Sequence, residues 1–202
     1  MKKILSIIAL SVVLLVITAV TSYAAITHTV EKGDSLWKIA VRYQVGLSEI
    51  KTANPSIKNY DLIYPGQSIT VPTLSSSTKA YETEVVRLVN QRRAEQGLKP
   101  LTQDWQLSRV ARFKSEDMSK LGYFSHNSPT YGSPFDMMKS FGISYRSAGE
   151  NIARGYKTPE EVVDAWMKSP GHRANILNSS YTHIGVGYVN SGNHWTQMFI
   201  FK

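Results

Sequence analysis

Residues 166–187 constrain the fold and the function of this chain most. They read WMKSPGHRANILNSSYTHIGVG. A helical segment ends at Ser169-Pro170-Gly171, His172 opens a second short helical run, and an apolar strand is expected from Ile184 to Val189. A helix that begins directly after such a break has unpaired backbone N–H groups, and polar ligands are favoured there. The pattern therefore predicts a helix–break–helix–strand unit with an imidazole at the break.

Two further polar residues lie beside turn residues elsewhere in the chain. His126 lies in FSHNSP, where a helix has ended, and Glu150 lies in AGENI, between a glycine and a hydrophobic run. A partly buried carboxylate needs a basic partner, because burying an unpaired charge is costly. We therefore expect His126, Glu150 and His172 to form one polar cleft. The alternative is that each histidine is a surface or capping residue.

Such a cleft is compatible with three kinds of chemistry. Two imidazoles and a carboxylate suit a divalent metal such as zinc with an open position, although no metal-binding spacing is present. Ser169 lies three residues before His172, so a serine–histidine–glutamate arrangement is a second option, without the Gly-x-Ser-x-Gly turn that would support it. Binding of a small ligand or of a protein is the third.

The amino terminus predicts export. Lys2 and Lys3 precede an apolar run from Ile4 to Val20, and Ser22-Tyr23-Ala24 has the small residues of a cleavage site after Ala24. Residues 1–25 are therefore predicted to be a signal peptide, with an uncleaved membrane anchor as the alternative. The chain has no cysteine, so each domain must be stable through its core alone, as suits a bacterial product.

The charge indicates an extracellular partner. The formal net charge is +8, and it falls to +6 when Lys2 and Lys3 are removed. A basic exported protein adheres to polyanions, which in a bacterial wall are teichoic acids and peptidoglycan carboxylates. No nucleic-acid motif is present, so nucleic acid is not expected as a partner. We expect a secreted, cell-wall-associated protein, with a membrane as partner only if the signal peptide is not cleaved.

A very small unit is predicted over residues 26–73. Ile26 to Val30 form a short strand, and the apolar spacing from Leu36 to Tyr43 predicts a helix. Ser48 to Ala53 predict a second helical segment, and Ser68 to Val71 supply the closing strand. The order strand, helix, helix, strand leaves little room for a core.

This unit resembles a LysM module, on HTVEKGDSLWKIA, the NP after the second helix, and YPGQSITVP. LysM modules bind N-acetylglucosamine-containing glycans such as peptidoglycan and chitin, in a groove between two loops. The resemblance implies glycan-binding roles for Gly33, Asp34, Ser35 and Leu36 on one side, and for Pro55, Ile57, Leu62 and Ile63 on the other. The alternative is that Asp34 only caps a helix and that Leu62 and Ile63 belong to the core.

Residues 74–80 are predicted to be a flexible linker. Leu74-Ser75-Ser76-Ser77-Thr78-Lys79 consists mainly of small polar residues, which cannot bury a core. Such a linker would tether the glycan-binding unit to the rest of the chain and raise the local concentration of the second domain at the wall.

A second domain is predicted over residues 81–202. Apolar stripes and capping residues predict four helices: one that ends at Gly97, one that ends at Gly122, one that starts at Ser133-Pro134 and one that starts at Thr158-Pro159. The last two segments form a hairpin around residues 190–193. Helices followed by a hairpin indicate a layered α+β domain.

This domain resembles the CAP superfamily, the cysteine-rich secretory protein, antigen 5 and pathogenesis-related group. The motifs are FSHNSP, SPFDMM, AGENIA, VVDAWMKSPGHRANILN and HIGVGY, and the likeness is to the bacterial extracellular and sporulation-associated branch. The resemblance implies an α-β-α sandwich with a central cleft. The expected fold class is therefore α+β: a small βααβ LysM module linked to an α-β-α sandwich CAP domain.

The resemblance also implies which residues occupy the cleft. The two family histidines correspond to His126 and His172, and one of two acids to Glu150. The second acid is expected three residues after Trp166, where this chain has Ser169. A hydroxyl in place of a carboxylate weakens the affinity for a divalent metal. His194 lies in a similar His-aromatic-Thr-Gln sequence, but the order of the motifs favours His172.

Two functions follow. The first is a secreted wall protein that binds peptidoglycan or another N-acetylglucosamine glycan, and whose CAP cleft binds a small ligand, a metal or a protein in an envelope- or sporulation-related role. The second is a secreted hydrolase that acts on peptides or wall material through His126, Glu150 and His172. The lack of a convincing nucleophile favours the first.

Overall fold

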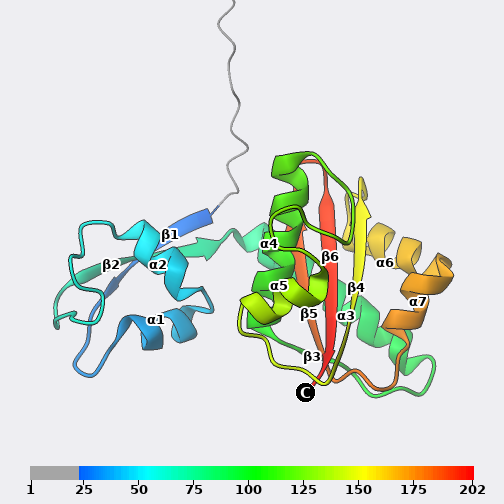
Figure 1. Cartoon of the computed structure of the whole chain (residues 1–202). Coiled ribbons are helices and arrows are strands. Elements are labelled where there is room, and N and C mark those ends of the chain that lie inside the picture. Colours follow the sequence, from blue (N-terminus) through cyan, green and yellow to red (C-terminus); the bar gives the residue numbers. More distant parts are fainter. Residues whose placement is uncertain (1–22) are drawn as a thin grey trace, which may run out of the picture.

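The computed structural model describes residues 23–202. They form an N-terminal module (residues 23–74) and a C-terminal domain (residues 75–202), which lie side by side (Figure 1). The predicted signal peptide, residues 1–25, lies outside the described residues except for its last three, which begin the first strand. None of the helices within residues 23–202 has the length and hydrophobicity needed to span a bilayer.

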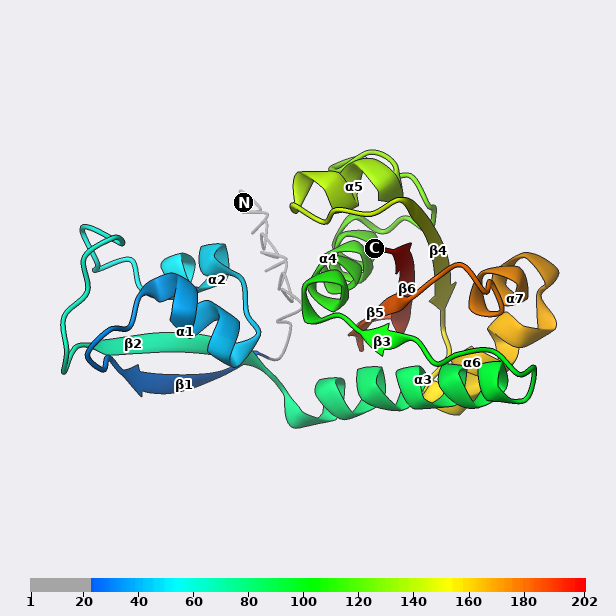
Figure 2. The same cartoon turned by 90° about the horizontal axis from the view of Figure 1, so that it is seen from below.

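The N-terminal module has the predicted order of elements. They are β1 (Tyr23–Thr29), α1 (Leu36–Tyr43), α2 (Leu47–Ala53) and β2 (Ser68–Leu74). The two strands pair antiparallel, with Ile26 opposite Val71, and both helices pack over one face of the pair (Figure 2). The buried Asn54 fixes α2 to this sheet, because its amide donates to the Ile50 and Thr70 carbonyls at 2.7 Å each and accepts from the Thr70 N–H at 2.8 Å.

Residues 74–80 are not a flexible linker, and this prediction was wrong. Strand β2 runs to Leu74, and helix α3 (Ser76–Ala94) begins two residues later. The Ser75 hydroxyl caps α3 by accepting a hydrogen bond from the Thr78 N–H at 3.1 Å. The small polar residues therefore form an N-cap and a first helical turn, which is the other use of such residues. A single residue separates the strand of one module from the helix of the next.

The C-terminal domain contains the remaining elements. After α3 come β3 (Thr102–Gln103), α4 (Trp105–Leu121), α5 (Pro134–Ser140), β4 (Ser147–Arg154), α6 (Pro159–Lys168), α7 (Pro170–Ile176), β5 (His183–Val189) and β6 (His194–Phe201). The four predicted helices, the break at Ser169-Pro170-Gly171 and the final hairpin are confirmed. Strands β3 and β4 had not been predicted.

A mixed sheet forms the middle layer of this domain. Its strand order is β3-β5-β6-β4, with β3 parallel to β5 and the other pairs antiparallel. Helices α4 and α5 cover one face, and α3, α6 and α7 cover the other (Figure 2). The predicted α-β-α sandwich is therefore confirmed, with one hydrophobic core on each side of the sheet.

Two glycines allow α4 to lie close to the sheet. A Cβ atom on Gly185 would overlap the α4 backbone at Leu107 and Ser108, and one on Gly187 would overlap it at Ala111. The close approach buries the inner face of α4, including one charged residue described below, Lys114.

Candidate functional site

His126 and Glu150 come from different elements and meet in space. His126 lies in the loop after α4, and Glu150 lies in β4 opposite Met198 of β6. The Nδ1 atom of His126 is 2.7 Å from Oε1 of Glu150. The His126 side chain is 52% exposed, whereas that of Glu150 is 1% exposed. A buried carboxylate thus orients an imidazole whose other nitrogen is free to face solvent.

The buried carboxylate is incompletely satisfied. Oε2 of Glu150 is buried without a hydrogen-bond partner among the described residues. Burial raises the pKa of Glu150 above its ordinary value, although the bond to His126 and the positive charge of Lys114 act in the opposite direction. A buried carboxylate with a free oxygen lowers stability. Because such costs concentrate at functional sites, this feature marks Glu150 as a candidate functional residue.

A buried lysine supports the loop that carries His126. Nζ of Lys114, which is fully buried, donates to the His126 carbonyl at 2.7 Å and to the Tyr123 hydroxyl at 3.2 Å. The Tyr123 hydroxyl donates to Asp117 at 2.6 Å. Burial lowers the pKa of Lys114, against the negative charges of Glu150 and Asp117. Lys114 therefore both holds the loop and places a positive charge near the Glu150 carboxylate.

His172 is held next to β4 by two asparagines. It lies in the first turn of α7, where Asn151 donates to its carbonyl at 3.1 Å. Asn175 donates to the Glu150 carbonyl at 3.2 Å and to Asn151 Oδ1 at 2.9 Å. Burial, and then the positive charge of His126, lowers the pKa of His172. The two imidazoles therefore lie within electrostatic range of each other.

The three predicted residues are thus brought together, and we call His126, Glu150 and His172 the His–Glu cluster. Ser169 is not part of its hydrogen-bond network. It lies between α6 and α7, and its hydroxyl makes no capping hydrogen bond. No bond between that hydroxyl and either imidazole is present within residues 23–202. His194 lies at the start of β6, opposite Arg154 rather than Glu150, with Nδ1 2.9 Å from the Ser191 carbonyl.

The arrangement does not assemble the predicted zinc site. No group of three or more His, Cys, Asp or Glu side chains within the described part of the chain is placed to hold a metal ion. His126 and Glu150 contact each other through atoms that would serve as ligands. Zinc binding by these residues therefore stays a prediction.

The first set of predicted glycan-binding residues lies in the turn before α1. Gly33 is exposed, with φ of 91°. Ser35 caps α1 by accepting from the Lys38 N–H at 3.2 Å. Asp34, in contrast, is not the helix cap. Hydrogen bonds from the Glu31 N–H and from His28 hold its pKa below the ordinary value, and its carboxylate ties this turn to both β1 and α1.

The apolar members of the predicted glycan site differ in exposure. Leu62 is 51% exposed and Pro55 is also exposed, so both are available to a ligand. Ile57 and Ile63 are partly buried against the module core. Leu36 is 3% exposed and belongs to that core, so any role in binding is limited to its backbone.

Three further residues of interest had not been predicted from the sequence. Lys114 interrupts the apolar stripe of α4 one turn after Val110 and one turn before Met118, and a charged residue at a buried position was the signal available. Trp37 and Tyr64 are 56% and 60% exposed in the N-terminal module. Exposed aromatic rings are suited to stacking on sugars, and both flank predicted glycan-binding residues in sequence.

Comparisons with known proteins agree with this architecture. The sequence model of the cysteine-rich secretory protein family, CAP, matches residues 86–201, and that of the LysM domain matches residues 28–72. The chain is 66% identical over 133 residues to the uncharacterized protein YkwD of Bacillus subtilis, which covers 66% of this chain and 52% of that protein. It thus spans about half the length of this relative.

Two further similarities concern shorter or more distant matches. The chain is 48% identical over 52 residues to the spore coat assembly protein ExsA of Bacillus cereus, covering 26% of this chain and 8% of that protein. Among solved structures, an extracellular protein containing an SCP domain from Bacillus anthracis superposes with a TM-score of 0.60 at 33% identity, covering 68% of this chain and 47% of that one. The chain therefore belongs to the CAP family and carries a LysM domain ahead of its CAP fold.

Proposed function

We propose that this protein is an exported, wall-associated binding protein. The LysM domain holds it on the N-acetylglucosamine glycan of peptidoglycan, and the CAP domain presents the His–Glu cluster to a small ligand or a protein partner. The observation that carries the proposal is the LysM match over residues 28–72 together with the exposure of Pro55 and Leu62 in the loop of that domain.

The names of the relatives support an extracellular setting. The Bacillus anthracis protein is described as extracellular, and ExsA of Bacillus cereus is described as a spore coat assembly protein. We therefore extend the proposal to the cell envelope, including the envelope of the spore. The positive net charge of the chain favours retention at an anionic wall.

A hydrolase is the second candidate, because one observation favours it. An exposed imidazole oriented by a buried carboxylate is the arrangement of a general base that activates water. No hydroxyl within residues 23–202 hydrogen-bonds to the ring of His126 or His172, so a side-chain nucleophile paired with its base is not formed. A hydrolase would therefore have to use water alone, and the first candidate is preferred.

Sedimentation with insoluble peptidoglycan tests the glycan-binding part. The mature chain, residues 25–202, is compared with Leu62→Asp and with the control Leu121→Asp, since the two leucines are 51% and 56% exposed in different domains. A charge among sugar-facing apolar contacts lowers retention roughly tenfold, the effect of about 1.4 kcal/mol. Equal retention of the two variants would remove the proposed role of the LysM loop.

A turnover assay distinguishes the two candidate functions. Peptidoglycan and protein substrates are incubated with the wild-type protein, His126→Ala and His172→Ala, with and without added zinc. The binding proposal predicts no turnover that depends on these histidines. Turnover that is present in the wild type and lost in both variants would favour the hydrolase. Elemental analysis of the same preparations tests the zinc prediction.

A further inference from the structure

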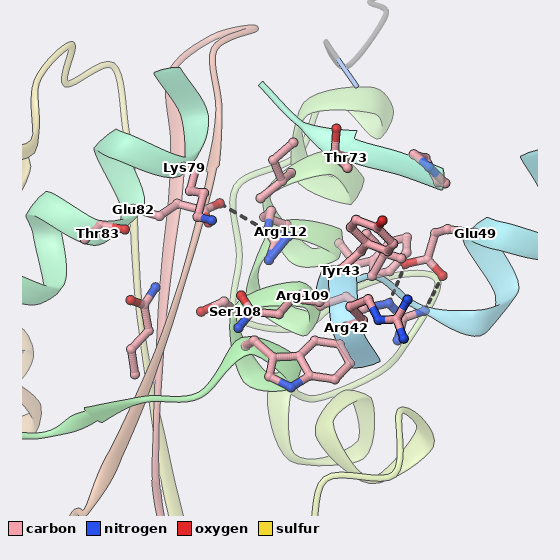
Figure 3. A pocket seen from close by; sticks show the side chains of 17 residues that line it. Arg42, Tyr43, Glu49, Thr73, Lys79, Glu82, Thr83, Ser108, Arg109 and Arg112 are labelled. Atoms are coloured by element: carbon pink, nitrogen blue, oxygen red, sulfur yellow. Dashed lines mark hydrogen bonds and ion pairs between the residues drawn. The ribbon is translucent and has the colours of Figure 1, made fainter. Parts of the chain in front are cut away.

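A polar hollow of about 480 Å³ lies where the N-terminal module meets the C-terminal domain (Figure 3). It is distinct from both the His–Glu cluster and the predicted glycan loop. Its charged lining comes from both sides of the junction: Arg42, Glu49, Lys79, Glu82, Arg109 and Arg112. Four cationic side chains therefore face two carboxylates in one cavity of the size that holds small ligands.

The wall of this hollow is held in place by an arginine that bridges the two modules. Nη2 of Arg109 donates to Oε2 of Glu49 at 2.7 Å and to the Ser48 hydroxyl at 3.0 Å, and Nε donates to the other Glu49 oxygen. The guanidinium also lies 5.0 and 5.2 Å from the ring centroids of Phe113 and Phe141. We call this contact the Arg109 clamp. Together with the one-residue connection at Ser75, it fixes the two sides of the hollow relative to each other.

The charges of Arg109 and Glu49 neutralise each other in the Arg109 clamp. Other residues must therefore attract a charged ligand. Arg112 lies at the opposite end of the hollow, with its Nε 3.2 Å from Oε1 of Glu82 (Figure 3). This Nε is nevertheless buried and has no hydrogen-bond acceptor among the described residues. The Nη atoms make no hydrogen bond within residues 23–202 and are not fully buried. Of the five donors that an arginine carries, the Nη donors are therefore open to a ligand in the hollow.

Glu82 does not fully compensate Arg112. Its side chain is 3% exposed and also accepts from the Tyr188 N–H at 3.2 Å. Burial raises its pKa to about 7, despite the opposite effects of Arg112 and of the Tyr188 N–H. Near neutral pH, therefore, a large fraction of Glu82 is uncharged. Lys79 is exposed on the same helix and has no ion pair within the described part of the chain, so positive charge prevails at this end of the hollow.

Arg112 also separates this hollow from a smaller one. The second hollow, of about 290 Å³, shares Arg112 and Leu74 with the first and continues between α3 and the β5–β6 turn. An unsatisfied guanidinium at the junction of two hollows is positioned to contact a group that is longer than a single ion.

We propose that this hollow is a second binding site that takes a short peptide with free carboxylates, and, resting on the proposed function, that the occupant is the stem peptide of peptidoglycan. A guanidinium with free donors pairs with a planar carboxylate through two parallel hydrogen bonds. The apolar parts of Tyr43 and Trp105 also line the hollow and contact aliphatic portions of a peptide.

The glycan loop and the hollow are connected by one ion pair. Nη2 of Arg42, which lines the hollow, lies 3.1 Å from Oδ1 of Asp34, one of the predicted glycan-binding residues. The loop lies beyond the Thr29–Ser68 end of the two-stranded sheet and the hollow lies at its Leu74 end, so a glycan strand and its peptide must extend along the module to engage both sites. Engagement of both groups would raise the overall affinity without further contacts, because the second binding event is intramolecular.

Isothermal titration calorimetry on the mature chain tests this inference with a soluble probe. The probe is synthetic L-alanyl-γ-D-glutamyl-meso-diaminopimelate, compared with its fully amidated form and with inorganic phosphate. The expected result is binding of the free tripeptide only. Equal binding of phosphate would show a general anion site, and equal binding of the amidated form would show that carboxylates are not recognised. Either result overturns the proposal.

Variants locate the site. Lys79→Gln and Arg112→Gln are expected to weaken tripeptide binding roughly tenfold each, the usual effect of one charge-assisted hydrogen bond. Arg112→Gln alone leaves the buried Glu82 without its cationic partner and can misfold for that reason. The double variant Glu82→Gln/Arg112→Gln removes both buried charges and avoids this problem. Lys139→Gln, at an exposed position of α5 outside the hollow, is the control. Unchanged affinity in Lys79→Gln and in the folded double variant contradicts the assignment.

The proposed function is tested separately in the same preparations. A chitin oligomer, which has no peptide, probes the LysM domain alone, and Leu62→Asp is expected to lose that binding while it keeps the tripeptide. Chitin binding without tripeptide binding would sink this inference and leave the wall-binding proposal intact. Tripeptide binding without chitin binding would do the opposite.

Discussion

Nδ1 of His126 lies 2.7 Å from Oε1 of Glu150, so an exposed imidazole of a loop contacts a buried carboxylate of the edge strand β4. Beneath them, Lys114 donates to the His126 carbonyl at 2.7 Å. The carboxylate retains one oxygen without a partner among the described residues. A loop held by a buried lysine beside an incompletely hydrogen-bonded carboxylate is expected where residues serve binding or chemistry at a cost in stability.

Glu150→Gln should therefore stabilise the fold while it removes the function of the His–Glu cluster. Burial raises the pKa of Glu150 above its ordinary value of 4.5. The protonated carboxyl therefore stabilises the folded wild type, and this contribution to the free energy of unfolding is lost as the pH rises above 4.5. At pH 8 the amide avoids the buried charge, and the free energy of unfolding should increase by about 1 kcal/mol. Urea denaturation measures this, with Glu160→Gln as an exposed control. A loss of stability at pH 8 would contradict the account.

Lys114→Met tests whether the buried lysine supports the His126 loop. The variant leaves the His126 carbonyl without its donor, so the free energy of unfolding should fall by roughly 1–3 kcal/mol. Lys120→Met in the same helix is the control, because Lys120 is 54% exposed and pairs with Glu116 at 3.1 Å from the solvent side. Chemical denaturation compares the two, and an equal effect on both would show that the Lys114 contacts are not stabilising.

Gly46→Ala should release the Arg109 clamp. A Cβ atom at Gly46 would overlap the side chains of Glu49 and Arg109, so the two modules should move independently and the radius of gyration in small-angle scattering should increase. Gly171→Ala is the control, since its Cβ meets nothing within 4 Å. A scattering curve identical to that of the wild type would show that the clamp does not hold the modules together.

Glu82 should make stability pH-dependent near neutrality. Its pKa of about 7 in the folded protein exceeds the ordinary value of 4.5, so its contribution is complete below pH 4.5 and is lost as the pH rises through about 7. The slope is at most about 1.4 kcal/mol per pH unit for one group. The stability of the wild type relative to Glu82→Gln should therefore fall from pH 5 to pH 8, whereas the difference from Glu84→Gln should stay constant. A constant difference for Glu82→Gln would mean that Glu82 is ionised throughout.

Elements whose signals act within a few residues could be predicted from the sequence, whereas elements that depend on distant contacts could not. The break at Ser169-Pro170-Gly171 and the α5 start at Ser133-Pro134 depend on capping and on proline, which act within a few residues, and both were predicted correctly. Strand β4 was missed because SAGENIAR is rich in residues that are rare in strands, and only its pairing with β6 makes it one. The serines of residues 75–77 suit either a linker or a helix start, and composition alone could not distinguish the two.

The same limit applies to the site residues. The family motifs indicated that His126, Glu150 and His172 lie near one another, as they do in the structure, because motifs carry information about contacts between distant segments. Their role in binding or chemistry stays a prediction. They gave no indication of Lys114, whose role depends on the close packing of α4 against Gly185 and Gly187. The hollow at the junction could not be predicted at all, since it depends on the relative placement of the two modules.

We propose above all that the LysM domain anchors this CAP protein on N-acetylglucosamine glycan. An NMR titration of the ¹⁵N-labelled mature chain with a soluble chitin oligomer tests this anchoring most directly. Chemical-shift changes are expected at Gly33, Asp34 and Ser35 and in residues 55–63, with the His–Glu cluster unchanged. Saturation without shifts in these loops, or shifts confined to the CAP domain, would contradict it.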